Sequence, residues 1–74
     1  MGEIIEYLRQ LRVPEPAQHW INNAERHLKE SAEPRSIMAA ACCLREASRY
    51  VKHEDTRRWL QSLTAYLENR AFSS

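Results

Sequence analysis

An eight-residue apolar run, Ile37–Leu44, constrains the fold of this chain more than any other feature. The run reads Ile-Met-Ala-Ala-Ala-Cys-Cys-Leu and contains no charged side chain. A helix that is apolar on every side must be buried on every side, so we expect this segment at the centre of the molecule. Its small alanine and cysteine side chains favour a close approach of the neighbouring helices.

Proline residues and hydrophobic periodicity divide the chain before this run into two helices. The residue before a proline leaves the helical region, and a proline is tolerated in the first turn of a helix. Val13–Pro16 and Ser31–Pro34 are therefore predicted corners, with the second helix opening at Pro16 or Pro14. Amphipathic stripes at helical spacing occupy the segments before these corners. They consist of Ile4, Ile5, Leu8 and Leu11, and of Ala17, Trp20, Ile21, Ala24 and Leu28.

The chain after Pro34 contains neither glycine nor a further proline, so it could form one long helix or two. The apolar stripe from Ile37 to Val51 points roughly a quarter-turn away from the stripe that begins at Trp59. This change of phase predicts that the third helix continues to Val51 and that the chain breaks near His53. We expect Asp55 as the N-cap of a fourth helix over residues 56–71, and frayed residues at 73–74.

These patterns predict an all-α fold, a small bundle of four short helices that forms one domain over residues 1–74. The alternative is a three-helix bundle to which the first helix is loosely attached. A chain of 74 residues buries only about 60% of its unfolded surface. Association with a partner or with a second copy would supply part of the missing burial.

Composition and motifs argue against several classes of function. The formal net charge is +1 and the longest apolar run has eight residues, far short of the roughly 20 that a membrane-spanning helix needs. No secretory leader is visible after Met1, and we expect a cytoplasmic protein with no membrane partner. The single glycine excludes a glycine-rich phosphate loop, and no Cys or His spacing matches a metal site. We therefore expect no enzyme activity, no cofactor and no metal.

The adjacent cysteines, Cys42 and Cys43, cannot form a disulfide with each other inside a helix. Unpaired cysteines are typical of a reducing compartment. We interpret both residues as small buried hydrophobic side chains of a tightly packed helix.

The segment 24–31 resembles the phosphoacceptor segment of histidine phosphotransfer domains, which are also small helical bundles. The resemblance rests on His27, Leu28 and Lys29. In that family the leucine and lysine follow one place later, and Glu30 stands near the position of a glycine that leaves room for the response regulator. The resemblance implies a phosphocarrier that uses His27, and we keep this function as an alternative.

A basic cluster lies between the predicted third and fourth helices. Lysine and arginine side chains on one face can hold phosphates, but Glu46, Glu54 and Asp55 interrupt this cluster and no helix-turn-helix signature accompanies it. Nucleic-acid binding through Arg57 and Arg58 is the second alternative, which we do not favour. The cluster consists of Arg45, Arg49, Lys52, Arg57 and Arg58.

The chain carries more aromatic side chains than one small core readily encloses, and such residues are the usual anchors of protein interfaces. We therefore predict an adaptor or regulatory module that acts through helix-face contacts with another protein or with a second copy of itself. The first helix could exchange between copies about its proline corner. The candidate interaction residues are Trp59, Leu63 and Tyr66, which share one stripe of the last helix, together with Arg58 and Trp20.

Overall fold

Helices account for almost all of the described chain. A computed structural model describes residues 2–73, which contain four helices and no strand. The helices are α1 (Gly2–Gln10), α2 (Glu15–Glu30), α3 (Pro34–Ser48) and α4 (Glu54–Ser73). The predicted all-α bundle of four helices is confirmed.

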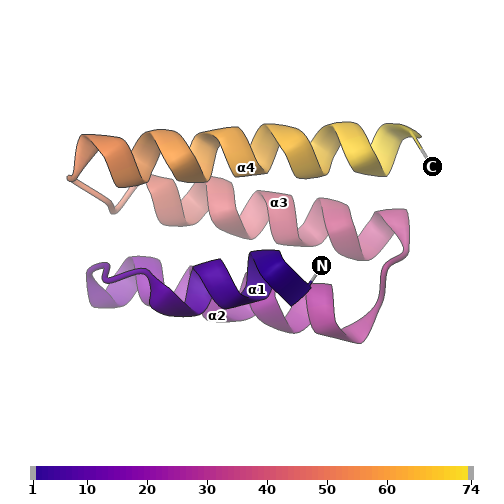
Figure 1. Cartoon of the computed structure of the whole chain (residues 1–74), viewed down its shortest axis with the longest axis horizontal. Coiled ribbons are helices and arrows are strands. Elements are labelled where there is room, and N and C mark those ends of the chain that lie inside the picture. The colour runs from indigo at the N-terminus through magenta and orange to yellow at the C-terminus, as the bar shows by residue number, and fades with distance from the viewer. Residues whose placement is uncertain (1, 74) are drawn as a thin grey trace.

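The helices are arranged around α3, which lies between α2 and α4 and packs along both of them (Figure 1). Consecutive helices run in opposite directions, and the molecule measures 33 × 19 × 18 Å. Within residues 2–73, the backbone of α1 approaches only that of α2. Leu8 of α1 is nevertheless fully buried, so α1 belongs to the core and the loosely attached alternative is not what the structure adopts.

Both predicted proline corners are present. Pro14 holds the N-cap position of α2, and its carbonyl oxygen accepts a hydrogen bond from the Gln18 N–H at 2.9 Å. Helix α2 therefore begins at Glu15, one residue before Pro16. At the second corner, Glu33 is extended and Pro34 is the first residue of α3, as the sequence predicts.

The chain breaks between α3 and α4 near His53, as predicted, but two details of the prediction are wrong. Helix α3 ends at Ser48 and not at Val51, because the Ser48 hydroxyl donates to the Arg45 carbonyl oxygen at 2.7 Å. The Arg49 N–H, which would bond to that oxygen in a continuing helix, bonds to the Glu46 carbonyl instead at 3.1 Å.

The second wrong detail is the N-cap of α4. The Arg57 N–H donates to the carbonyl oxygen of His53 at 3.0 Å, so the first helical turn closes on His53 rather than on Asp55. Glu54 and Asp55 both lie inside the first turn. There their negative charges interact favourably with the helix dipole. At the other end α4 extends to Ser73, and Ser74 lies outside the described residues.

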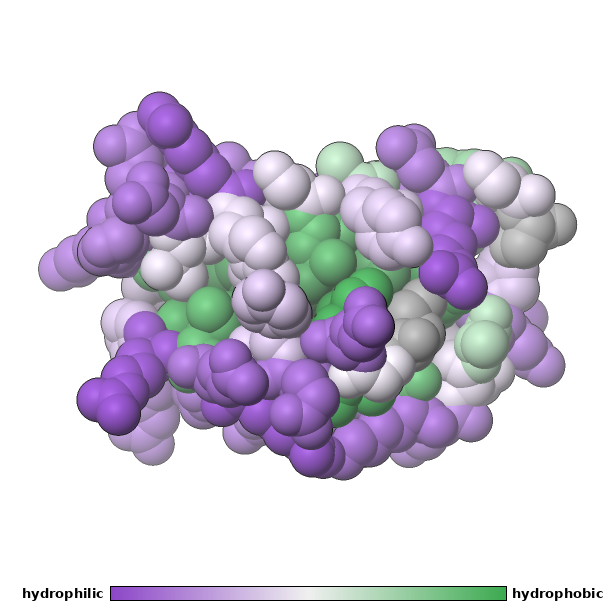
Figure 2. All heavy atoms as spheres, viewed as in Figure 1, coloured by the Kyte–Doolittle hydropathy of each residue, from purple (hydrophilic) through white to green (hydrophobic). Residues whose placement is uncertain are grey.

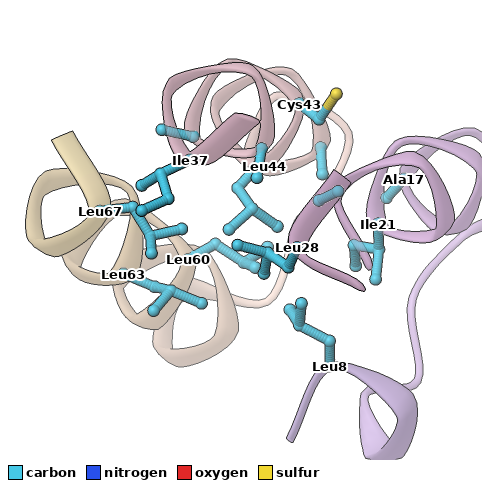
Figure 3. Close-up of a cluster of buried hydrophobic side chains, with 14 of the residues drawn as sticks. Leu8, Ala17, Ile21, Leu28, Ile37, Cys43, Leu44, Leu60, Leu63 and Leu67 are labelled. Carbon is cyan, nitrogen blue, oxygen red and sulfur yellow. The ribbon is translucent and has the colours of Figure 1, made fainter. Parts of the chain in front are cut away.

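All four helices contribute to one hydrophobic core (Figure 3). Its largest fully buried side chains are Leu8, Ile21, Leu44, Leu60 and Leu67. Helices α2 and α4 do not approach each other at the backbone within the described chain. Side chains from all four helices, with Leu28 of α2 and Leu60 of α4 at the centre, fill the space between them (Figure 3).

The segment Ile37–Leu44 is central, but the expectation that it is buried on every side is wrong. Ala40 and Leu44 are fully buried, whereas Met38 and Ala39 are half-buried and Cys42 is exposed. The reason is that, among the described helices, α3 packs along α2 and α4, so the side of α3 that faces neither of them stays open. The buried small side chains, Ala40, Ala41 and Cys43, still favour a close approach of the neighbouring helices.

The two cysteines differ in environment. Cys42 is exposed and Cys43 is buried. Burial raises the pKa of the Cys43 thiol above its ordinary value; the adjacent Cys42 adds to this effect and Arg26 opposes it. Since the thiolate is the reactive form, Cys43 should be the less reactive of the two.

The packing of α3 predicts different outcomes for leucine at two adjacent alanines. Ala40→Leu should lower the free energy of unfolding by about 1–3 kcal/mol, because Ala40 has no exposed surface and the larger side chain overpacks the core. Ala39→Leu is the matched control and should change stability by less than about 0.5 kcal/mol. Urea denaturation measures both; equal losses would contradict the close packing at Ala40.

The cysteine environments predict a reactivity difference. At pH 8 the Cys42→Ser variant, which retains Cys43, should react with Ellman's reagent at least about ten-fold more slowly than Cys43→Ser, which retains Cys42. Because burial raises the pKa of the Cys43 thiol and keeps it protonated, the rate of the variant that retains Cys43 should continue to increase as the pH is raised above 8. Equal rates in the folded protein would contradict this assignment.

Candidate functional site

Four large hydrophobic side chains are exposed on the described chain: Tyr7, Tyr50, Tyr66 and Phe72. Two of them, Tyr7 on α1 and Tyr66 on α4, face the seam between these helices. Exposed aromatic residues that gather at one place on a small protein are typical of an interaction surface.

Helices α1 and α4 leave a groove between them. In the described part of the chain, no Cα atom of α1 lies within 8 Å of a Cα atom of α4. Two hollows of about 550 Å³ and about 260 Å³ occur along this seam. We call the seam the α1–α4 groove; its apolar and aromatic lining consists of Ile4, Tyr7, Leu11, Trp59, Leu63 and Tyr66.

Figure 2 shows this side of the molecule. Hydrophobic atoms occupy the centre of the face between the edges formed by α4 and α1, and hydrophilic side chains surround them. An apolar floor with a polar rim is the usual anatomy of a protein interface.

Three side-chain contacts lie in or beside the groove. The rings of Tyr7 and Trp59 lie 5.6 Å apart between centroids and are inclined by 32°, so they bridge the two helices near one end. On α4 the Arg70 guanidinium donates a hydrogen bond to the Tyr66 hydroxyl at 3.1 Å. On the other flank of α1, Arg9 is ion-paired with Glu25 of α2 at 2.7 Å.

The separation of the two helices explains why the groove exists. Within the described chain, the backbone of α1 approaches α2 and comes nowhere within 8 Å of α4. Side chains of both helices line each hollow, so the groove lies alongside α1 and not beyond its end. Trp59 and Tyr66 of α4, which face this seam, therefore remain accessible to a partner.

The structure brings three of the five predicted interaction residues together. Trp59, Leu63 and Tyr66 all line the groove, although Leu63 is also part of the core. Arg58 points elsewhere and is ion-paired with Glu54 of the same helix at 2.8 Å. Trp20 lies on α2, where it packs against the core and its ring meets His19 edge-on.

The contribution of α1 to this groove goes beyond the prediction from the sequence. The predicted apolar stripe of the first helix includes Ile4 and Leu11 but not Tyr7. The spacing of Ile4, Tyr7 and Leu11 carries a signal for this face, because residues three or four apart lie on one side of a helix. The spacing does not show which neighbouring helix this face contacts.

The residues of the two alternative functions lie outside the groove. His27 is half-buried on α2, and Arg57 is exposed at the first turn of α4. In the basic cluster, Arg45 is ion-paired with Glu68, Arg49 with Glu46 and Arg58 with Glu54. Acidic partners therefore neutralise much of this cluster.

Other kinds of site find little support in residues 2–73. No group of three or more His, Cys, Asp or Glu side chains there could hold a metal ion. A hollow of about 230 Å³ between α3 and α4 is lined by the ion-paired Arg45 and Glu68. No helix of the described chain is both long and apolar enough to cross a membrane.

Comparisons of the chain with models of protein families, with curated proteins and with solved structures found no match. The α1–α4 groove and its side chains are therefore the basis on which a function is proposed.

Proposed function

We propose that this chain is a protein-interaction module that binds the apolar face of a partner helix in the α1–α4 groove. The observation that carries the proposal is the alignment of two hollows with Tyr7, Trp59 and Tyr66 along one seam of the bundle. The action is by contact between helix faces, and it needs no cofactor.

The chemistry of the groove favours a helical partner. Amphipathic helices bind in hydrophobic grooves through apolar residues spaced three or four positions apart. The groove runs along α4, a helix of 20 residues, so it offers contacts over several turns of a partner. Tyrosine and tryptophan contribute large contact areas at a low cost in conformational entropy.

Small size also favours association. A bundle of 74 residues leaves a large share of its surface uncovered. Covering the groove removes apolar surface from water at about 25 cal/mol per Å². The exposed aromatic rings are not buried in the core of the single chain, so their burial would stabilise the complex instead.

Two tyrosines provide a matched pair of variants. Tyr66 in the groove is 50% exposed, and Tyr50, in the turn after α3 and outside the groove, is 44% exposed. Both side chains are largely outside the core, and serine has nearly the same helix propensity as tyrosine at position 66, so neither change should unfold the protein. A library of displayed amphipathic helical peptides is selected on the wild-type protein, and the affinity of the selected peptides is measured by titration.

We expect selected peptides with apolar residues at positions i, i+3 or i+4, and i+7. Tyr66→Ser should weaken their binding about ten-fold or more, whereas Tyr50→Ser should change it by less than about two-fold. Selection of peptides without this spacing, or equal affinity for the two variants, would contradict the proposal.

A further inference from the structure

Helix α4 presents a nearly symmetric set of side chains to the groove. Trp59 and Tyr66 lie about 5 Å on either side of the point midway between Ser62 and Leu63, and Asp55 and Arg70 lie about 11 Å on either side. Trp59 and Asp55 line one hollow, and Tyr66 and Arg70 line the other. A two-fold rotation that reverses the helix about that point therefore places Tyr66 where Trp59 was, and Trp59 where Tyr66 was.

The same reversal exchanges a negative charge for a positive one. An antiparallel pair of α4 helices, centred between Ser62 and Leu63, places Asp55 of each copy opposite Arg70 of the other. Opposite charges at both ends fix the register of such a pair, and antiparallel helix dipoles attract each other. Ser62 is small and exposed, so the two helices can approach closely at the centre.

From this pattern we infer that the occupant of the α1–α4 groove is a second copy of the same chain. The two copies pack α4 against α4 in antiparallel orientation about a two-fold axis beside Ser62, with Tyr66 of each copy over Trp59 of the other. A two-fold interface is the commonest way in which identical chains associate. The inference rests on the proposed function, because it names the partner for the same groove.

The limited contact area indicates a weak association. The whole molecule is only 33 Å long and 19 Å wide, and a contact centred on α4 buries part of that face. Such a contact lies at or below the lower end of the range for specific complexes, about 1,200 Å² in total. We therefore expect a dissociation constant in the micromolar range.

Charge reversal tests the register of the dimer. Sedimentation equilibrium of the full chain, at concentrations up to about 500 µM, should show a monomer–dimer equilibrium for the wild type. Asp55→Arg places like charges opposite each other at both ends and should raise the dissociation constant about ten-fold. The double variant Asp55→Arg with Arg70→Asp restores opposite charges and should return the constant to within about three-fold of the wild type.

Glu54→Arg is the matched control, because it makes the same change of charge in the same helical turn. Glu54 does not line either groove hollow and is ion-paired along its own helix with Arg58. This variant carries the same cost to the helix dipole and should leave the dissociation constant within about three-fold of the wild type. Circular dichroism establishes that each variant retains the helical fold.

Three results would overturn the inference: a wild-type protein that stays monomeric, an equal effect of Asp55→Arg and Glu54→Arg, or no recovery in the double variant. None of these results bears on the peptide measurement. A monomer whose peptide binding depends on Tyr66 would reject the second copy as occupant and retain the groove as a binding site. Loss of both the dimer and the Tyr66-dependent binding would reject the two proposals together.

Discussion

Close packing of α3 against α2 and α4 determines the arrangement of the whole bundle. The side chains at these two contacts include Ala40, Ala41, Cys43 and Ala47, all buried and small. Small side chains bring helix axes near the short end of the usual 8–10 Å separation. Because α3 packs extensively along both α2 and α4 in the described chain, the positions of these two helices depend on it. The remaining corner of the bundle is left to α1.

Helix α1 fills that corner only in part, and this incomplete packing leaves the α1–α4 groove open. Leu8 seals the core, while Ile4 and Leu11 remain half-buried. A first helix packed against α4 as well as α2 would cover the groove and add apolar burial to the single chain. The gap between α1 and α4 leaves apolar and aromatic side chains accessible instead, and the proposed function uses this surface.

Helix α4 contributes side chains both to the core and to the α1–α4 groove. Leu60 and Leu67 pack into the core, whereas Trp59 and Tyr66 line the groove at the next helical positions. The apolar stripe of α4 is therefore wider than one neighbouring helix requires. That excess width, together with the surplus of aromatic residues, is the feature from which the sequence predicted Trp59, Leu63 and Tyr66 as an interaction stripe.

Local chemistry in the sequence determined the four helices, since proline geometry and hydrophobic phase act between residues only a few positions apart. The tertiary structure decided the features that depend on contacts between distant parts of the chain. The exposure of Cys42 depends on how many helices surround α3. The pairing of Tyr7 with Trp59 depends on two helices from opposite ends of the chain. Such contacts follow from the relative placement of whole helices, which depends on the volumes of core side chains that no local pattern encodes.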